Sequence, residues 1–247
     1  MILYNDDAYK KIKELKDNSI DLVLIDPPYD IEGIEKERKI KKCSSYIDYC
    51  AKKTMSKISA FSKGIDFSIL DEFSRICKKL NLFIFCNKQL LFKLINYYID
   101  DNYLKEVLIW HKTNVCPLTS GTFLPDIEYI FYVRERGVKL RGGYYEKKKV
   151  FETQTNIREK NIWQHPTIKP QEILMNLIKV STDEKDIVLD CFMGTGSTGV
   201  ASHKTNREFI GIEIDKKWFD IAQKRIKQEQ EKISIWEYLD GKENSKN

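Results

Sequence analysis

Short apolar runs alternate along this chain with longer stretches in which apolar residues recur every three or four positions. Several of the runs are apolar on both faces and some are rich in β-branched residues, which is typical of strands buried between two layers of helices. We therefore predict strands at residues 20–25, 80–86, 107–110, 127–133, 187–189 and 209–212.

The stretches between these runs predict helices. Apolar side chains fall on one helical face in each of three places, and Pro170 suits the first turn of the second helix. Strands that alternate with helices indicate an α/β fold with a doubly wound, mostly parallel sheet, in a single domain over residues 1–240. The three faces consist of Phe67, Leu70, Phe73 and Cys77; Ile173, Leu174, Leu177 and Ile178; and Trp218, Ile221, Ala222 and Ile226.

Two segments interrupt this alternation. Residues 30–64 are rich in Lys, Ser and Glu and show little periodicity. They are too long for an ordinary connection, so we expect a mobile loop. Residues 137–164 are basic and aromatic, and Gly142-Gly143 would suit the turn of a hairpin. The polar residues 241–247 are expected to form a flexible tail.

Bulk composition narrows the class of protein. The 247 residues carry 42 Lys and Arg against 37 Asp and Glu, and the net charge of +5 leans mildly towards polyanionic partners. No run approaches the roughly 18 apolar residues of a membrane span, and the first residues lack the plan of a secretory signal. The six cysteines contain no CxxC pair. We therefore expect a cytoplasmic protein with reduced thiols and no metal site.

The first chemically informative segment is Asp26-Pro27-Pro28-Tyr29, directly after the predicted strand at 20–25. At that end of a strand, side chains face the ligand crevice of an open α/β sheet. The Asp26 carboxylate and the Pro27 carbonyl can each accept one N–H bond of a conjugated amine, which directs its lone pair towards an incoming methyl group. The Tyr29 ring can stack on the base. A rigid strand-ending turn with an exposed acid is the alternative interpretation.

The second informative segment, residues 190–199, contains GxGxxG, and Glu213 ends the next predicted strand. Glycines let the backbone approach a ligand, and Glu213 can hold two ribose hydroxyls, but dinucleotide-binding folds share these features. Asp190 favours S-adenosylmethionine, because its carboxylate suits the ammonium and sulfonium groups of that cofactor better than a pyrophosphate. The chain after the glycine loop is also too short for a two-lobed dinucleotide domain. A glycine-rich turn that binds no ligand is the alternative interpretation.

Taken together, the motifs resemble the beta class of amino-group DNA methyltransferases. In order, the chain has DPPY, a basic variable stretch, HPTIKP at 165–170, DCFMGTGSTG at 190–199 and FIGIEID at 209–215. Residues 5–8 resemble the opening acidic turn of the family, and residues 82–87, 108–112 and 128–133 resemble its later core strands. The resemblance covers about residues 1–232 apart from the two interruptions. Cys191, where family members commonly carry proline, is a departure.

The resemblance implies a role for each matching residue. Asp26, the Pro27 carbonyl and Tyr29 would grip the target base, and Pro28 completes the catalytic segment. HPTIKP would close over the methionine end of S-adenosylmethionine. The candidate cofactor-binding residues are Asp7, Ala8, Asp26, His165, Thr167, Lys169, Asp190, Phe192, Met193, Gly194, Thr195, Gly196, Ser197, Thr198, Glu213 and Ile214.

The two basic interruptions are the candidate DNA-contacting segments. Residues 137–164 stand where the family keeps its target-recognition region, and we expect the 30–64 loop to order when DNA binds. The candidate contacts are Lys36, Arg38, Lys39, Arg141, Tyr144, Lys147, Lys148 and Arg158.

These observations predict a site-specific methyltransferase that acts on adenine in double-stranded DNA, because Asp at the head of the tetrapeptide is typical of adenine-specific members of the family. Cytosine N4 in DNA, adenine in RNA, a dinucleotide-dependent oxidoreductase and a non-catalytic DNA-binding protein are the alternatives. A homodimer and a cognate restriction endonuclease are further partners that the sequence leaves open.

Overall fold

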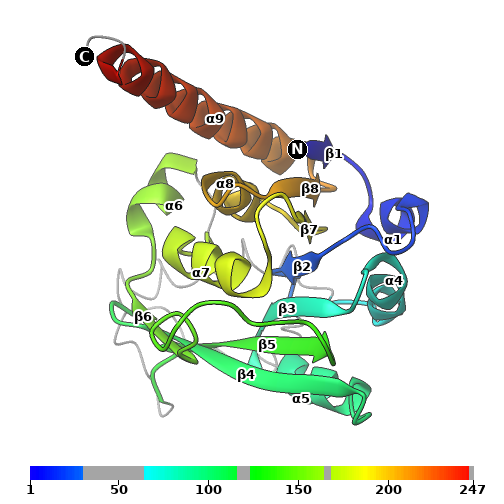
Figure 1. The fold of residues 1–247 in the computed structure, drawn as a ribbon. Helices are drawn as coiled ribbons and strands as arrows, with labels where there is room; N and C mark the ends of the chain where they lie inside the picture. The colour runs from blue at the N-terminus through cyan, green and yellow to red at the C-terminus, as the bar shows by residue number, and fades with distance from the viewer. Residues whose placement is uncertain (30–63, 116–122, 164–167, 245–247) are drawn as a thin grey trace.

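The structure is a computed structural model that describes residues 1–29, 64–115, 123–163 and 168–244 (Figure 1). Within these ranges one sheet has the strand order β1-β8-β7-β2-β3-β5-β4-β6. The strands are β1 (Ile2–Tyr4), β2 (Leu22–Ile25), β3 (Asn81–Cys86), β4 (Tyr103–Lys112), β5 (Ile127–Glu135), β6 (Val150–Thr153), β7 (Ile187–Asp190) and β8 (Glu208–Ile212).

Most neighbouring strands of this sheet are parallel. Parallel pairing joins β1 to β8, β8 to β7, β7 to β2, β2 to β3 and β4 to β6. Only β5 runs antiparallel to its neighbours β3 and β4 among the described strands. The prediction of a doubly wound, mostly parallel α/β sheet is therefore confirmed. Because β2, β7 and β8 are parallel, the segments that follow them emerge at the same edge of the sheet.

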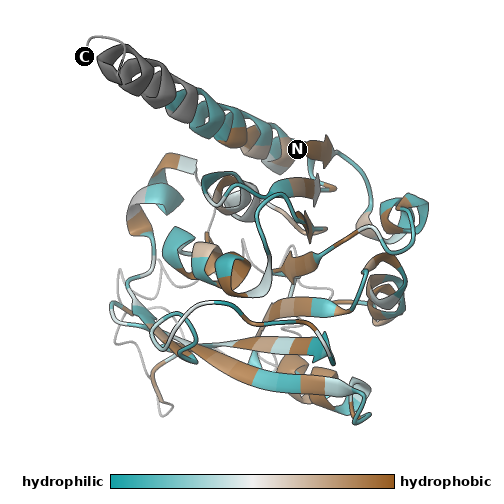
Figure 2. Cartoon of the chain, viewed as in Figure 1, coloured by the Kyte–Doolittle hydropathy of each residue, from teal (hydrophilic) through white to brown (hydrophobic). Residues whose placement is uncertain are grey.

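Helices cover both faces of the sheet, which explains why its central strands are apolar on both sides. One face packs against α1 (Ala8–Lys11), the short 3-10 helix η1 (Ile12–Glu14), α4 (Ser68–Ile76) and α5 (Lys88–Tyr97). The other packs against α7 (Gln171–Ser181), α8 (Ser197–Lys204) and α9 (Lys216–Asn244). Figure 1 shows α7 and α8 on the opposite side of the sheet from α1 and α4, and Figure 2 shows hydrophobic residues filling β2 and β7 between them.

The predicted strands and helices are present, although their ends shift. The strand expected at 107–110, for example, is part of the longer β4. The strands β1 and β6 were not predicted, because they are short and, unlike β2 and β7, contain no run of buried apolar residues. No helix in the described part of the chain is both long and apolar enough to cross a membrane.

The prediction of a hairpin around Gly142-Gly143 is wrong. Gly142 does turn the backbone with a φ of +82°, but β6 pairs in parallel with β4, not with a strand immediately before the turn. The outer edge of β4 offers unpaired backbone groups, and β6 satisfies them. Of the other two irregular segments, residues 30–63 and 245–247 lie outside the described residues, and residues 241–244 of the expected tail belong to α9.

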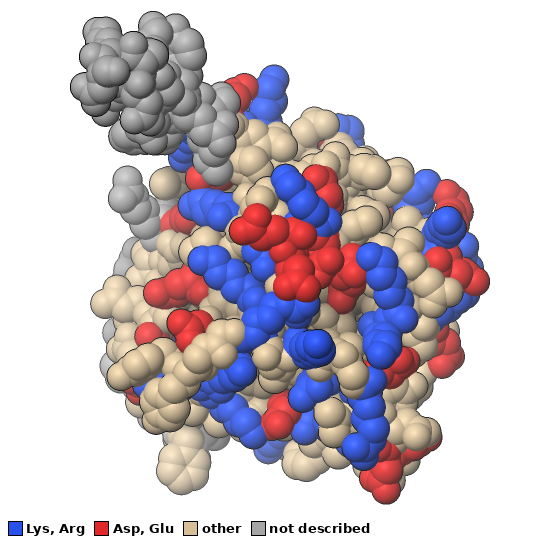
Figure 3. All heavy atoms as spheres, in the orientation of Figure 1, with Lys and Arg blue, Asp and Glu red and all other residues tan. Residues whose placement is uncertain are grey.

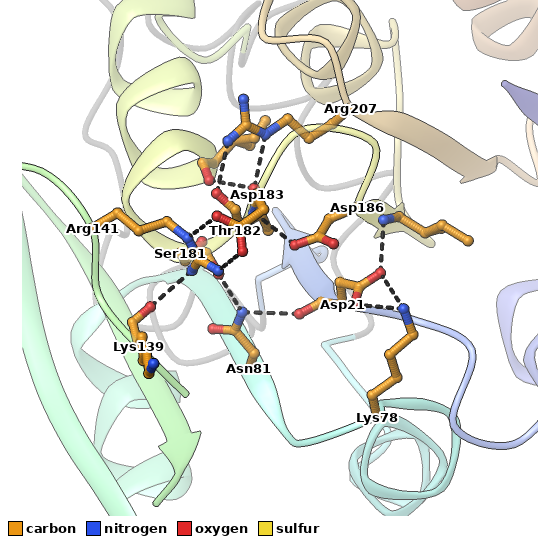
Figure 4. A network of polar contacts seen from close by, with 12 residues as sticks. Asp21, Lys78, Asn81, Lys139, Arg141, Ser181, Thr182, Asp183, Asp186 and Arg207 are labelled. Atoms are coloured by element: carbon orange, nitrogen blue, oxygen red, sulfur yellow. Dashed lines mark hydrogen bonds and ion pairs between the residues drawn. The ribbon is translucent and has the colours of Figure 1, made fainter. Parts of the chain in front are cut away.

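A polar network closes the amino-terminal edge of the sheet (Figure 4). The side chain of Asn81, at the start of β3, donates to the backbone oxygens of Asp21 at 2.9 Å and Ser181 at 3.0 Å. Arg141 forms a two-pronged ion pair with Asp183, which lies just before β7. Arg141, predicted to contact DNA, is thus paired with Asp183 at the edge of the sheet away from the carboxyl ends of the strands.

Candidate active site

A cavity of about 440 Å³ opens at the carboxyl ends of β2, β7 and β8. Tyr29, from the segment after β2, and Gly194, from the turn after β7, both line it. The two sequence motifs thus form walls of one pocket. The predicted site residues that line this cavity are Asp7, Ala8, Asp26, Pro27, Pro28, Tyr29, Lys169, Asp190, Phe192, Met193, Gly194, Thr195, Ser197, Thr198, Glu213 and Ile214.

Asp26 directly follows β2, and its carboxylate is held on two sides. The Tyr29 hydroxyl donates to Oδ1 of Asp26 at 2.8 Å, and Nζ of Lys169 lies 2.7 Å from Oδ2. Pro27 and Pro28 restrict the backbone between the acid and the ring, which keeps both on the same wall. This corner offers a hydrogen-bond acceptor and an aromatic face to a planar ligand with N–H donors.

Two charged residues behind this corner were not predicted as site residues. Glu128 lies in β5, with Oε1 2.8 Å from Nζ of Lys169, and Nζ of Lys112 lies 2.7 Å from its Oε2. The Tyr29 hydroxyl is also 3.0 Å from Oε1 of Glu128. A carboxylate inside an apolar strand was the available signal, because such a group needs a buried partner. The sequence does not say which cation provides it.

Burial and charge act against each other in this corner. Burial raises the pKa of the Asp26 carboxyl; Lys169 opposes the rise and Glu128 adds to it. Burial acts the same way on Glu128, but Lys169 and Lys112 outweigh it and lower the pKa of Glu128 to about 2. Burial opposes the charge of Lys169, yet the two carboxylates raise the pKa of its ammonium group. Burial also raises the pKa of Tyr29 well above its usual value, so its hydroxyl remains a donor.

The glycine turn after β7 is tied to the end of β8. Gly194 has a φ of +50°, and its backbone N–H donates to Oε2 of Glu213 at 2.9 Å. The N–H of Asp215 donates to Oε1 of the same carboxylate at 2.9 Å. These bonds orient Glu213 at the cavity wall and leave lone pairs that can accept hydroxyl groups of a ligand.

Asp190, the last residue of β7, is a buried acid on the cavity wall, only 3% exposed. The Thr198 hydroxyl donates to its Oδ2 at 2.6 Å, and the N–H of Phe192 donates to its Oδ1 at 3.0 Å. Burial raises the pKa of Asp190 to about 7. No Lys or Arg of the described ranges pairs with it. A cationic ligand would therefore stabilise its ionised form.

Gly196 is the one described candidate cofactor residue that does not line the cavity. It stands before α8 with a φ of +77°, and a Cβ there would lie 3.0 Å from the Cβ of Ala222. Its glycine is needed for the turn and for packing against α9, and direct contact with a ligand in this cavity is not supported. His165 and Thr167 lie outside the described residues.

Arg225 of α9 supports the glycine turn from behind and was not predicted. It is 5% exposed, and its guanidinium donates to Oγ of Ser197 at 2.9 Å. The same group forms an ion pair with Glu159 of α6 (Ile157–Trp163). Arg225 thus connects the turn after β7 with the basic segment at 137–164.

The remaining candidate DNA contacts divide into several groups. Tyr144 and Tyr145 are 78% and 76% exposed, and Nζ of Lys148 lies over both rings, 5.5 and 4.9 Å from their centroids. Lys147 is exposed beside them. Arg158 falls in α6, and its side chain is not described; Lys36, Arg38 and Lys39 lie outside the described residues. On the face shown in Figure 3, basic and acidic side chains are intermixed.

Comparison with known families and curated proteins gives consistent matches. A family model described as DNA methylase, with N6 and N4 in its name, matches residues 20–224. The type II methyltransferase M2.DpnII of Streptococcus pneumoniae is 28% identical over 94% of this chain and 91% of its own length. The type II methyltransferase M2.LlaDCHI of Lactococcus lactis subsp. cremoris is 30% identical over 91% of this chain and 88% of its own length.

Solved structures share the fold at lower identity. The M1.HpyAVI–SAM complex has a TM-score of 0.66 and 22% identity, covering 91% of this chain and 98% of the other. The PvuII DNA methyltransferase, named as cytosine-N4-specific, has a TM-score of 0.66 and 14% identity, covering 90% of this chain and 84% of the other.

Proposed function

This chain belongs to the DNA methylase family, and from that membership we propose that it transfers the methyl group of S-adenosylmethionine to the exocyclic amino group of adenine in double-stranded DNA. The observation that carries the proposal is the cavity that Tyr29 and Gly194 share. One wall presents acceptors for an amino group, and the other presents acids for a nucleoside with a cationic tail. A shared cavity lets the two ligands meet in one orientation.

The Asp26 corner suits the target base. We assign Asp26 and the Pro27 carbonyl to the two N–H bonds of the amine, which turns its lone pair towards the other wall. The Tyr29 hydroxyl donates to Oδ1 of Asp26 here, but a carboxylate oxygen can accept a second hydrogen bond, and the Tyr29 ring is available to stack on the base. Stacking and these hydrogen bonds offset the few kcal/mol, roughly, that extrusion of a base from a duplex requires.

The opposite wall fits S-adenosylmethionine. Asp190 is a buried acid without a cationic partner in the described chain, and it suits ammonium or sulfonium charge. Glu213, oriented by the N–H of Gly194, suits the ribose hydroxyls. When bound, the cofactor supplies a methyl group made electrophilic by its sulfonium. We assign Lys169 of the HPTIKP segment to the target side and not to the cofactor, because its Nζ lies 2.7 Å from Oδ2 of Asp26.

Adenine is proposed as the base because Asp26 heads the tetrapeptide, as in the adenine-specific methyltransferases that the chain resembles. A fold neighbour named as cytosine-N4-specific makes the distinction worth testing directly. The exposed Tyr144, Tyr145 and Lys148 support the proposal that residues 137–164 recognise the target. Aromatic rings and ammonium groups are suited to bases and phosphates respectively.

The test is nucleoside analysis after incubation of the purified protein with S-adenosylmethionine and mixed-sequence duplex DNA, with RNA in a parallel reaction. N6-methyldeoxyadenosine in the DNA is the expected product by mass spectrometry. N4-methyldeoxycytidine would overturn the choice of base, and methylation of RNA alone would overturn the choice of nucleic acid. Protection from thermal unfolding by a nicotinamide cofactor, and not by S-adenosylhomocysteine, would favour an oxidoreductase.

A further inference from the structure

Four charged side chains from separate segments meet behind the target side of the cavity. Asp26 and Lys169 line the cavity, whereas Glu128 and Lys112 do not. The contacts run in series: Asp26 to Lys169, Lys169 to Glu128 and Glu128 to Lys112, at 2.7, 2.8 and 2.7 Å. The side chains are 24, 6, 11 and 18% exposed in that order. The formal charges of this group, which we call the buried quartet, sum to zero.

We propose that Glu128 and Lys112 are positioning residues for methyl transfer: Glu128 anchors Lys169 beside Asp26, and Lys112 offsets the negative charge of Glu128, which would otherwise oppose the ionised form of Asp26 that accepts from the target amine. This inference rests on the proposed function of Asp26. A lysine anchored by two carboxylates has a defined position, so Oδ2 of Asp26 is held while Oδ1 faces the base.

Glu128 also provides a second hydrogen-bond acceptor for the Tyr29 hydroxyl. The single hydrogen of the Tyr29 hydroxyl lies within reach of Oδ1 of Asp26 at 2.8 Å and of Oε1 of Glu128 at 3.0 Å. When an amine N–H approaches Asp26, the hydroxyl can donate to Glu128 instead. The exchange leaves the hydroxyl hydrogen-bonded in both arrangements.

The charge balance predicts shifts of opposite sign. Methyl transfer requires ionised Asp26, so the rate falls as the pH drops through the pKa of that carboxyl. Lys112→Met removes a positive charge and disfavours ionised Asp26. It therefore moves the acid limb of the kcat–pH profile, the part where the rate falls with decreasing pH, to higher pH. Glu128→Gln removes a negative charge and moves it to lower pH. We expect about half a pH unit in each direction, below the one unit or more that a charge within about 4–6 Å commonly causes, because Lys112 contacts Glu128 and not Asp26.

Other titratable groups lie near the quartet and have to be separated from Asp26. Burial raises the pKa of Cys86 to about 12, so the thiol is neutral in the pH range of the test. Burial, Lys169 and Lys112 lower the pKa of the half-buried Lys160 and Glu128 opposes this, so the pKa of Lys160 also changes in the variants, and a signal from the Asp26 carboxyl itself is needed to separate the two groups. Among the described residues, the groups that face Asp26 or the quartet are Tyr29 from the same segment, Cys86 of β3, Lys112 of β4, Glu128 of β5, Lys160 of α6, Lys169 before α7 and Asp190 of β7.

The experiment measures kcat against pH on duplex DNA for wild type, Lys112→Met, Glu128→Gln and the double variant. The double variant removes one charge of each sign, and its acid limb should return to within about 0.2 pH units of wild type if the balance governs Asp26. Lys112→Arg keeps the charge and should retain the wild-type limb. Glu106→Gln, an exposed ion-pair residue on the same strand as Lys112, is the matched control and should shift nothing.

A readout without turnover completes the test. The ¹³C signal of the Asp26 carboxyl, assigned with Asp26→Asn, is titrated in each labelled variant and should shift in the same two directions. The inference is overturned if the acid limb of kcat and the titration of the Asp26 carboxyl stay at the wild-type pH. It is also overturned if both shift in the same direction in the two single variants. If one single variant does not fold, the other and the double variant still decide it. Absence of methyl transfer by wild type would instead overturn the proposed function, and the titration would still test the charge coupling.

Discussion

The backbone N–H of Gly194 donates a 2.9 Å hydrogen bond to Oε2 of Glu213. The bond joins the turn after β7 to the end of β8, and it aims the carboxylate along the wall of the cavity. An acid fixed in this way pays little entropy when it accepts hydroxyl groups of a ligand, because its orientation is already set.

Glu213→Ala should weaken binding of S-adenosylmethionine about tenfold or more, since hydrogen bonds to a charged acceptor contribute about 1.5–3 kcal/mol. Titration calorimetry measures the affinity. Glu208→Ala, at the other end of β8 and exposed, is the control and should bind as wild type does. Equal affinity of Glu213→Ala and wild type would remove Glu213 from the ribose site.

Asp26→Ala should bind S-adenosylmethionine but transfer methyl to DNA at least about 10²–10³-fold more slowly, because a preorganised polar contact to the reacting group is lost. Single-turnover methyl transfer and calorimetry on the same preparation separate the two effects. Wild-type-like turnover would contradict the role given to this carboxylate.

Binding of S-adenosylmethionine should depend on pH through Asp190. Burial raises the pKa of this carboxyl from 3.8 to about 7 in the free protein, so it contributes stability at low pH that is lost as the pH rises towards 7. A cationic ligand favours the ionised form, and affinity should therefore rise by up to about tenfold per pH unit between about pH 5.5 and 7.

Asp190→Asn should bind more weakly at pH 7 and lose this dependence. Calorimetry across the same pH range measures both quantities. A wild-type affinity that is flat with pH would show that the carboxylate does not face the charge of the ligand.

Lys148 and Arg141 should differ in their effect on DNA binding although they lie in one basic stretch. Lys148 is exposed over two tyrosine rings, whereas Arg141 is paired with Asp183. Lys148→Ala should reduce the slope of log affinity against log salt by about 0.9, the contribution of one phosphate contact. Arg141→Ala should leave the slope unchanged. Fluorescence anisotropy at several salt concentrations tests this, and the reverse ranking would contradict it.

Asn81→Ala should lower the free energy of unfolding by about 3 kcal/mol, because it leaves the two carbonyls that Asn81 bonds, and the Tyr132 hydroxyl, without their partner in a buried site. Urea denaturation measures the change. Asn102→Ala, whose side chain is exposed and bonds only Asp100, is the control. Since Asn81 lies at the edge of the sheet away from the cavity, kcat of the folded variant should stay within about twofold of wild type.

The strands that carry the site could be predicted because burial on both faces leaves a local trace. β2 and the first three residues of β7 are apolar, and Asp26 and Asp190 stand where those apolar runs end. β6 left no such trace. Its four residues form a strand only because the outer edge of β4 offers backbone partners, which is a long-range condition.

For residues with more than one possible role, too, the sequence gives the options and contacts with distant residues distinguish between them. In the sequence, Gly196 is consistent with a glycine-rich ligand loop, and the structure adds a packing requirement, since a Cβ there would lie 3.0 Å from the Cβ of Ala222 in α9. Arg141 and Lys148 look alike in a basic run, and the location of Asp183 separates them.

The amino-acid sequence alone determines the alternation of strands and helices, and it places the DPPY and glycine segments at the ends of strands. Both follow from the sequence because hydrophobic periodicity and turn chemistry act between residues that are near neighbours in the chain. Which distant charges meet is decided by packing. Asp26, Lys169, Glu128 and Lys112 come from four separate segments, and Coulomb energy in a buried site depends on ångström distances that no spacing along the chain encodes.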